Sequence, residues 1–476
     1  MPSIISPVDG SVYSTVPYLT REHAVAKIEA AQRAQKELRR LSLQERIALC
    51  RRALHAFSEE IESHALALTK MTGKPLSQAR AEFESGVRER TEFLFDVAEE
   101  ALAPVVLEDV HASPGVRIRR FIRREPLGVV LDIAAWNYPW LIVTNILFPA
   151  LLAGNAVLIK HAEQTAPVAD QWADAFARAG APEGAVQAFF PDHQTIAELL
   201  DQRRFDGLSF TGSVRGGHEV AQAVGRENFL PVGFELGGKD AAYVCADADI
   251  PFAAENLADA AFYNAGQSCC GVERIYLHQE VREPFLREFE KHLRALRLGS
   301  PLEQSTSLGP LIHGRARQHA LEQVEGALKG GGFDLVSPAE FQVPGLSDCY
   351  MAPRALVDVA QDSDLMQTES FAPVVGIRSV DDDAEALSKM NDSRYGLTAS
   401  IWSNDYEKAL GLGEKLQVGT VFQNRADYLD PALPWSGRKD SGVGLSLSRF
   451  GFHHLTRTKS YHMRETRGVV EGEENG

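Results

Sequence analysis

Residues 128–162 read GVVLDIAAWNYPWLIVTNILFPALLAGNAVLIKHA, and this stretch decides the fold class. Its apolar middle is long, but Asn145, Pro149 and the pair Gly154-Asn155 interrupt it. A membrane span needs an unbroken apolar run of about 20 residues, so a buried helix, a turn and a strand fit better. An apolar strand-like run stands on each side of the helix, at 128–135 and 156–162. The stretch therefore predicts a β-α-β unit.

The same alternation of short apolar strands with helical segments continues along the chain. Further strands are predicted at 185–190 and 207–212, and a second α/β region follows residue 236, with strands at 241–246, 273–278 and 419–424. Residues 20–104 are rich in Ala, Glu, Arg and Leu at helical spacing, which predicts amphipathic helices. Repeated β-α-β units build parallel sheets covered by helices, so we predict an α/β protein.

Composition narrows the class of protein. The chain has 476 residues and a net charge of −16, which disfavours nucleic acid or an anionic membrane surface as a partner. Five cysteines, an odd number without a Cys-x-x-Cys pair, indicate neither a disulfide framework nor a metal site. The first residues lack the basic and apolar regions of a signal peptide. We therefore expect a cytoplasmic protein without a metal.

Three polar residues stand in places that suit catalysis. Cys269 lies in NAGQSCCGVER (264–274), Glu235 lies in FELGGKD (234–240), and Asn137 lies in AAWNYPW (134–140). A thiolate is a nucleophile, a carboxylate activates water, and an amide donates to an oxyanion. Taken singly, each has a plainer interpretation as an inert core thiol, a surface acid and a turn-forming residue.

The segment SFTGSVRGG (209–217) predicts a strand, a Gly-Ser turn and a helix. A helix amino terminus with free amides suits a phosphate group, although an ordinary strand-helix turn explains the segment as well. No Gly-x-Gly-x-x-Gly follows a strand, so the usual dinucleotide fingerprint is absent from the sequence.

Six motifs occur together and in a fixed order: AAWNYP, IKHAEQT, FTGSVRGG, FELGGKD, NAGQSCC and ESFAPV. In this order the chain resembles the aldehyde dehydrogenase superfamily over about residues 5–465. The resemblance implies an aldehyde-dehydrogenase-like α/β fold with a Rossmann-type cofactor domain (1–108 and 127–236) and an α/β catalytic domain (237–450). It also implies a small β oligomerisation element (109–126 and 453–465), and hence a homodimer or homotetramer. The acidic end, 466–476, is expected to be disordered.

By the Gly-Gln-x-Cys pattern, the resemblance makes Cys269 the catalytic thiol, with Asn137 holding the oxyanion and Glu235 activating water. It implies cofactor contacts from Trp136, Lys160, Glu163, Phe210, Gly212, Ser213, Gly237, Glu369 and Phe371. It implies a substrate tunnel that includes Tyr138, Asn145, Arg425 and Trp435. Because a carboxylate such as Glu163 accepts from ribose hydroxyls and repels a 2′-phosphate, NAD is the expected cofactor and NADP the alternative.

The chain also departs from the family pattern. Lys-His-Ala-Glu (160–163) replaces a common Lys-Pro-Ser-Glu, and Pro191-Asp192 replaces a glycine turn, so the adenine pocket is expected to be reshaped. Ile146 and Ser446 stand where many relatives carry the Lys and Glu of a proposed proton path. Proton removal must then use another route or be slower.

The predicted activity is oxidation of a small-molecule aldehyde to the acid with NAD(P), through a thioester on Cys269 that water resolves. Two alternatives stay open: a CoA-acylating enzyme, for which Glu235 has no use, and a catalytically inactive structural or binding relative. Trp435 and Tyr138 favour a bulky apolar aldehyde. Arg425 would favour a semialdehyde if it pointed into the tunnel, and otherwise faces solvent or pairs with Asp427 or Asp430.

Overall fold

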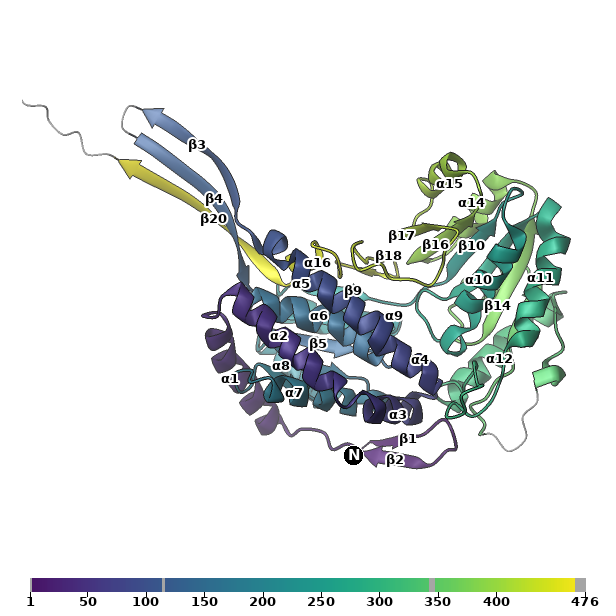
Figure 1. Cartoon of the computed structure of the whole chain (residues 1–476), viewed down its shortest axis with the longest axis horizontal. Coiled ribbons are helices and arrows are strands. Elements are labelled where there is room, and N and C mark those ends of the chain that lie inside the picture. The colour runs from purple at the N-terminus through teal and green to yellow at the C-terminus, as the bar shows by residue number, and fades with distance from the viewer. Residues whose placement is uncertain (1, 114–115, 342–346, 467–476) are drawn as a thin grey trace, which may run out of the picture.

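The computed structural model describes residues 2–113, 116–341 and 347–466. Two large sheets form the body of the molecule, and a three-stranded sheet projects from it (Figure 1). The helices are α1 (Arg21–Leu38), α2 (Leu43–Ser58), α3 (Ile61–Thr72), α4 (Leu76–Ala81), α5 (Arg88–Leu102), α6 (Pro139–Ala153), α7 (Pro167–Arg178), α8 (His193–Asp201), α9 (Val214–Glu227), α10 (Ile250–Phe262), α11 (Arg282–Ala295), α12 (Gly314–Lys329), α13 (Asp364–Gln367), α14 (Asp383–Asn391), α15 (Tyr406–Gly413) and α16 (Gly451–His454).

The first sheet has the strand order β19-β9-β8-β5-β6-β7, and all neighbours are parallel except β19, which runs antiparallel to β9. Its strands are β5 (Val129–Ala134), β6 (Ala156–His161), β7 (Val186–Ala188), β8 (Gly207–Thr211), β9 (Val232–Glu235) and β19 (Gly442–Val443). The strand order reverses between β5 and β8, which is where ligands bind in open parallel sheets.

The stretch at 128–162 folds as its sequence predicts. Strand β5 leads into α6, which is buried along most of its length, and Gly154 ends that helix in the left-handed region at φ 95°. Strand β6 then returns parallel to β5. No helix in the described part of the chain combines the length and the apolar character that crossing a membrane requires.

The second sheet has the order β12-β13-β14-β11-β10-β16-β17 and is parallel apart from β12. Its strands are β10 (Asp240–Val244), β11 (Val272–His278), β12 (Phe333–Asp334), β13 (Arg354–Val357), β14 (Val374–Val380), β16 (Thr398–Trp402) and β17 (Thr420–Gln423). Helices cover both of its faces, with one apolar core on each face. Two further strand pairs join β1 (Ser3–Ile5) to β2 (Val12–Thr15) and β15 (Tyr395–Gly396) to β18 (Arg438–Lys439).

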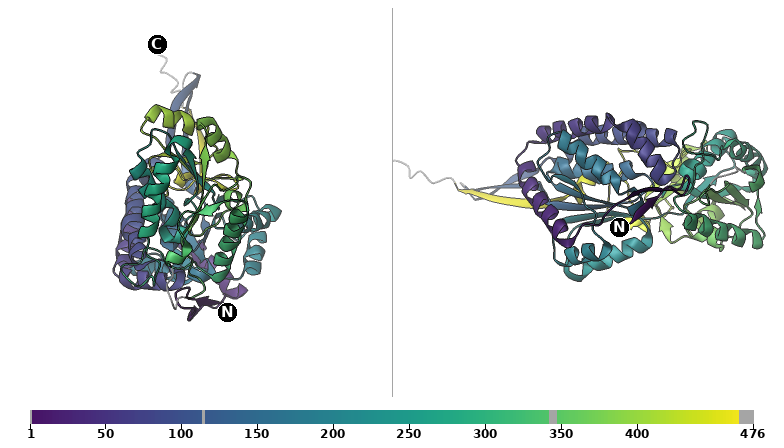
Figure 2. Two further views of the ribbon diagram at one scale, coloured as in Figure 1. Left: turned by 90° about the vertical axis from the view of Figure 1, so that its right-hand side faces the viewer. Right: turned by 90° about the horizontal axis from the view of Figure 1, so that it is seen from below.

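The projecting sheet consists of β3 (Val105–Ser113), β4 (Val116–Pro126) and β20 (Thr456–Thr466), in the order β20-β4-β3. The predicted pairing of the segment before residue 127 with the carboxyl-terminal strand is confirmed, with Thr456 opposite Pro126 and Thr466 opposite Val116. The three strands extend away from the two lobes, as the right-hand view of Figure 2 shows. The assembly role of this sheet and the domain limits stay predictions, and residues 467–476 of the predicted tail lie outside the described residues.

Asn155 ties the projecting sheet to the first sheet. This buried side chain accepts from the Gly128 N–H at 2.9 Å and donates to the carbonyls of Ala150 at 3.1 Å and Leu455 at 2.9 Å. One amide thus connects the start of β5, the end of α6 and the residue before β20.

We expect Asn155→Ala to destabilise the protein by about 3 kcal/mol, because it leaves buried backbone groups without partners. The midpoint of urea unfolding measures this effect. Asn256→Ala is the matched control, since Asn256 makes one hydrogen bond, to the Phe252 carbonyl of its own helix; its effect should stay within about 0.5 kcal/mol. Equal shifts in the two variants would contradict the bridging role of Asn155.

Candidate active site

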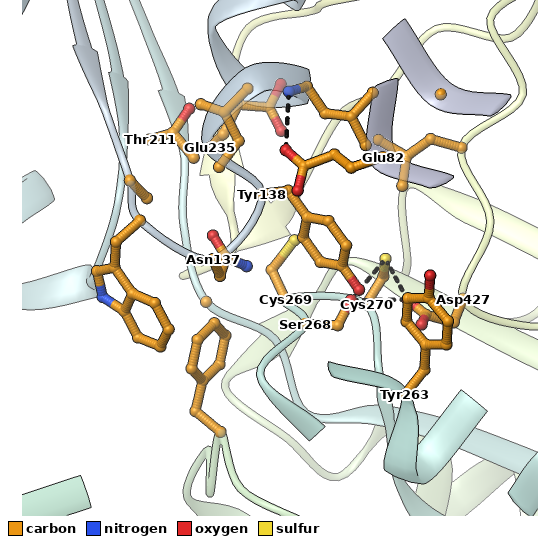
Figure 3. Close-up of a pocket in the computed structure, with 18 of the residues that line it drawn as sticks. Glu82, Asn137, Tyr138, Thr211, Glu235, Tyr263, Ser268, Cys269, Cys270 and Asp427 are labelled. Carbon is orange, nitrogen blue, oxygen red and sulfur yellow. Dashed lines mark hydrogen bonds between the residues drawn. The ribbon is translucent and has the colours of Figure 1, made fainter. Parts of the chain in front are cut away.

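The carboxyl edge of the first sheet faces the amino edge of the second, and a cavity of about 700 Å³ lies between them (Figure 3). From the first sheet come the residues that end or follow its strands: Trp136 and Asn137 after β5, Gly212 and Ser213 after β8, and Glu235 at the end of β9. From the second sheet come residues that precede its strands: Gly237 before β10, Cys269 before β11, and Glu369 and Phe371 before β14. Nine predicted site residues are therefore brought together.

Cys269 is partly accessible in this cavity, whereas Cys270 is buried. The Cys270 thiol donates to an Asp427 carboxylate oxygen at 3.1 Å, and the Ser268 hydroxyl donates to the same oxygen at 2.7 Å. A side-chain hydrogen bond with Cys269, together with burial and the charge of Asp427, raises the pKa of Cys270 well above its usual value. The two adjacent thiols therefore differ in environment, and only the Cys269 thiol is accessible for reaction in the cavity.

Asn137 lies against the loop that carries Cys269. Its side-chain amide donates to the Gln267 carbonyl at 3.2 Å, and the Asn264 amide donates to the Asn137 carbonyl at 3.2 Å. Gln267 is held in turn by the Ile312 N–H, which donates to it at 2.8 Å. The Asn137 amide is thus a fixed hydrogen-bond donor beside the Cys269 backbone.

Glu235 also lines the cavity, at the end of β9. Burial raises the pKa of this carboxyl to about 8, and the side chains of Ser446 and Trp435 and the charge of Arg90 act in the opposite direction. The Ser446 hydroxyl donates to a Glu235 carboxylate oxygen at 2.8 Å. A carboxyl group with a pKa near neutrality is suited to take up and release protons.

Ser446, at the position where many relatives carry a glutamate, thus contacts the Glu235 carboxyl group directly. Its backbone forms an antiparallel bridge to Trp435, with N···O distances of 2.8 and 3.0 Å, which directs its hydroxyl toward Glu235. Ile146, at the position where many relatives carry a lysine, is buried in the core beside α5. In place of the Glu and Lys of the proposed proton path, this chain thus has the hydroxyl of Ser446 and the apolar side chain of Ile146.

The amino terminus of α9 has the geometry of a phosphate site. Gly212 and Ser213 line the cavity, and the Ser213 hydroxyl caps the helix by accepting from the Gly216 N–H at 3.2 Å. Phe210 lies below this turn, so a Cβ atom on Gly212 would meet the Phe210 ring at 2.9 Å. These residues fit the pyrophosphate of a dinucleotide, which needs a bare backbone and free N–H groups.

Glu369 and Phe371 lie on the opposite wall. Glu369 accepts from the Gly238 N–H at 2.9 Å, and a Cβ atom on Gly237 would lie 2.4 Å from the Glu369 carboxyl. Burial raises the pKa of Glu369 to about 8. Phe371 meets Trp136 edge to face, with ring centroids 5.5 Å apart. The two rings and the carboxyl group form a slot suited to a flat ring and a ribose.

Lys160 and Glu163 are not among the residues that line this cavity. Lys160 is buried, with its ammonium group 5.5 Å from the centre of the Phe190 ring. The Tyr18 ring stacks on Phe190, with ring centroids 5.2 Å apart. The Tyr18 hydroxyl donates to the exposed Glu163 carboxylate. These residues form a separate surface at the carboxyl end of β6.

Three of the four predicted tunnel residues line the cavity, namely Tyr138, Asn145 and Trp435. Arg425 does not: it is exposed, and its guanidinium group stacks on the Tyr428 ring at 3.5 Å. The structure thus leaves Arg425 outside the cavity, held by an aromatic neighbour three residues along the chain. No group of His, Cys, Asp and Glu side chains suited to a metal ion occurs among the described residues.

Arg90 and Asp427 are two cavity residues that sequence reasoning missed. Arg90 is 7% exposed and donates to the Asn145 side-chain carbonyl at 2.9 Å. The sequence did hold a signal for Arg90, because this arginine lies in the buried stripe of α5 together with Thr91, Leu94 and Ala98. Asp427 lies in a loop and has a positive φ of 48°, for which the sequence pattern holds no comparable signal.

Known proteins resemble this chain over nearly its whole length. The model of the "Aldehyde dehydrogenase family" matches residues 2–461. An aldehyde dehydrogenase of Paenarthrobacter nicotinovorans is 33% identical over 96% of this chain and 98% of its own. A probable NADP-dependent succinate-semialdehyde dehydrogenase of Synechocystis is 32% identical, covering 96% and 98% of the two chains.

Among solved structures, the succinic semialdehyde dehydrogenase of Streptococcus pyogenes, in complex with NADP+, superposes with a TM-score of 0.90. It is 26% identical, and the match covers 97% of this chain and 99% of that one. The α/β fold, the whole-chain family match and the two relatives above 30% identity agree. The chain therefore belongs to the aldehyde dehydrogenase family and is an NAD(P)-dependent aldehyde dehydrogenase.

Proposed function

We propose that this enzyme converts an aldehyde to the free carboxylic acid through a thioester on Cys269, which water cleaves. The observation that carries the proposal is the shared cavity of an accessible thiol, an amide donor and a carboxyl group whose pKa is raised to about 8. Each of these groups has a use in that reaction. An inactive binding protein would have no need to keep all three beside one cavity.

In the first step the Cys269 thiolate adds to the aldehyde carbon and forms a thiohemiacetal. The Asn137 side-chain amide and the Cys269 N–H would donate to the oxygen that becomes negative. The present Asn137 contact with Gln267, at 3.2 Å, is long enough to yield to a better acceptor. An oxyanion donor of this kind contributes about 3 kcal/mol to the barrier reduction.

The chemistry that NAD or NADP supplies when bound is acceptance of a hydride. Residues of this chain that would hold the cofactor are Trp136, Gly212, Ser213, Gly237, Glu369 and Phe371 around the cavity. Phe210 would support the turn at Gly212 from below, and Lys160 and Glu163 lie beyond the cavity. Their part is to bind and orient it next to Cys269. Cys269 itself carries the acyl group until it is hydrolysed.

Glu235 completes the reaction as the general base. Its carboxylate takes a proton from water, and the resulting nucleophile attacks the Cys269 thioester. A base with a pKa near 8 matches a neutral working pH better than an ordinary glutamate does. A CoA-acylating enzyme would use a thiol in place of water, so the presence of Glu235 favours hydrolysis.

The names of the relatives do not identify the aldehyde that this enzyme oxidises. Similar proteins include enzymes named for phenylacetaldehyde, betaine aldehyde and aspartate semialdehyde, at 34%, 31% and 32% identity. They also do not choose the cofactor, since the Synechocystis relative and the S. pyogenes structure are both described with NADP. For this chain, we propose NAD on the basis of Glu163, whose carboxylate would accept from the ribose hydroxyls.

The test of the activity compares Cys269→Ala with Cys270→Ala. We expect Cys269→Ala to lower kcat by about 10⁴-fold or more, because the nucleophile is lost. Cys270→Ala should retain most of the activity, since its thiol faces Asp427. Reduced cofactor is followed by absorbance, and the acid is quantified with and without CoA. Equal losses in both variants, or a product that requires CoA, would contradict the proposal.

The second prediction concerns the pH dependence of hydrolysis. Glu235 must be deprotonated to act as a base, so the steady-state rate should rise with pH up to about 8 where hydrolysis is rate-limiting. Ser446→Ala removes a donor that favours the carboxylate, so the pKa of Glu235 should increase and the profile should move by about one unit to higher pH. Glu235→Gln is the control: its first burst of reduced cofactor should persist while turnover stalls.

An unchanged pH profile in Ser446→Ala would mean that Glu235 does not control the rate. Steady-state turnover at the wild-type rate in Glu235→Gln would exclude Glu235 as the base.

The third prediction is a higher kcat/KM for NAD than for NADP. A 2′-phosphate beside the Glu163 carboxylate would cost on the order of 1 kcal/mol, or about fivefold. Glu163→Gln should therefore improve kcat/KM for NADP relative to NAD by about that factor. Lys160 acts in the opposite direction, so the preference should be moderate. Comparable kcat/KM values for the two cofactors in the wild type would contradict the preference.

A further inference from the structure

Arg90 is the one Lys or Arg side chain among the described residues that line the active-site cavity. It projects from the buried stripe of α5 toward α6, where its Nη1 donates to the Asn145 side-chain oxygen at 2.9 Å. Asn145 is neutral, so this contact orients the guanidinium group without balancing its charge. Burying a cation without an anionic partner costs free energy. An anionic ligand that binds in the cavity would supply the partner that Arg90 lacks.

The nearby carboxylates of the protein have other partners. Glu82 pairs with the buried ammonium group of Lys74 and accepts from the Trp140 N–H at 2.9 Å. Glu89 accepts from the Tyr428 hydroxyl at 3.0 Å. Glu235, whose charged form the charge of Arg90 favours, accepts from the Ser446 hydroxyl at 2.8 Å. Within the ranges that the structure describes, no carboxylate comes within ion-pair distance of Arg90, whereas the exposed Arg88 of the same helix pairs with Glu84.

The free capacity of Arg90 matches a carboxylate. Arginine has five N–H donors in a planar fork, and one hydrogen bond to a side chain is recorded for Arg90. The fork binds two carboxylate oxygens side by side, which a lysine ammonium group does not do. Because Arg90 lines the same cavity as Cys269, one ligand can have its aldehyde at the thiol and its anionic group at the fork.

We propose that Arg90 binds a carboxylate at the far end of the substrate, so that the preferred substrates are aldehydes with a distal carboxylate. This inference rests on the proposed function, because it needs the aldehyde to bind at Cys269. It replaces the role that sequence reasoning considered for Arg425, which lies outside the cavity. Asn145 acts as a positioning residue, since its side-chain oxygen holds the guanidinium group in place.

The acidic side chains that line the cavity determine where a substrate carboxylate can bind. Asp427 and Asp259 also line it, and burial raises the pKa of both carboxyl groups, which favours their neutral forms. A distal carboxylate is therefore expected to bind at Arg90 and not at the wall formed by these two residues. The charge of Arg90 also reaches Cys269 and Cys270. A role in thiol activation is the competing explanation, and the experiment must separate the two.

The experiment compares kcat/KM for three matched pairs: butanal with 4-oxobutanoate, pentanal with 5-oxopentanoate, and hexanal with 6-oxohexanoate. We expect the wild type to prefer at least one oxo acid over its alkanal. In Arg90→Met, kcat/KM for that oxo acid should fall by about 10- to 100-fold, mainly through KM, because a charge-assisted hydrogen bond is lost. The matched alkanal should change by less than about threefold.

Two variants serve as controls. Arg90→Lys keeps the charge but loses the fork, so its loss for the oxo acid should be intermediate. Arg88→Met makes the same change two residues away on α5, at a side chain that is 45% exposed and paired with Glu84. Arg88→Met should leave kcat/KM unchanged for the alkanal and for the oxo acid of each substrate pair.

A second readout does not depend on turnover. Hexanoate should protect Cys269 of the wild type from iodoacetamide, as followed by mass spectrometry, and should fail to protect it in Arg90→Met. Hexanamide, which has the same shape without the charge, should protect neither protein. Loss of protection in Arg90→Met with normal labelling in the absence of ligand would exclude misfolding as the cause.

Three results would overturn the inference: no preference for any oxo acid in the wild type, equal losses for alkanal and oxo acid in Arg90→Met, or equal protection by hexanoate in both proteins. Equal losses together with slower labelling of Cys269 would assign Arg90 to thiol activation. If none of the six aldehydes were oxidised with either cofactor, the proposed activity would fail, and the labelling result would still decide the role of Arg90.

Discussion

The contact between the backbone of Cys269 and Gly238 is the constraint on which the active site depends. A Cβ atom at position 238 would lie 2.3 Å from the Cys269 carbonyl oxygen, so a side chain there is excluded. Gly238 also donates its N–H to Glu369, and the neighbouring Gly237 has room for no side chain beside that carboxyl group. Two adjacent glycines therefore set the distance between the strand that carries Glu235, the loop that carries Cys269 and the wall that carries Glu369. Without this close packing the two sheets could not share one cavity.

The same cavity shows how the position of a carboxyl group in the fold changes its pKa. Glu235 and Glu369 arise from different sheets, yet burial raises the pKa of each to about 8. Their partners differ, because Glu235 receives a hydroxyl hydrogen bond from Ser446 and Glu369 receives a backbone N–H from Gly238. The donor to Glu235 can be changed by substitution, whereas the donor to Glu369 belongs to the backbone. This difference allows the proton affinity of one acid to be altered while the other is kept.

Much of this could be predicted from the sequence, for a physical reason. Strands, turns and the residues at strand ends follow from local patterns, so β5, α6 and β6 could be predicted from a short stretch. The joining of Asn137, Glu235 and Cys269 in one site was expected from the resemblance to the family, because each residue taken singly had a plainer interpretation. Contacts between distant segments carried no such pattern. The bond from Ser446 to Glu235 joins residues 211 positions apart, and that from Tyr18 to Glu163 joins residues 145 apart. Arg425 shows the opposite error, since a residue next to a motif on a loop can point in any direction. Arg90 was detectable, because a charge within an apolar helical stripe is unusual.

The projecting sheet has a consequence for the making of the protein. Strand β4 ends at Pro126, but β20, its partner on one edge, begins only at Thr456. On a ribosome that adds about 5–20 residues per second, the first hairpin must wait on the order of tens of seconds for its third strand. Meanwhile Val105, Val106 and Leu107 of β3 are exposed apolar residues on the opposite edge, and exposed strand edges invite aggregation. Strand β20 thus completes a sheet whose first two strands were synthesised more than 300 residues earlier, and a chain truncated before residue 456 would leave that hairpin with two open edges.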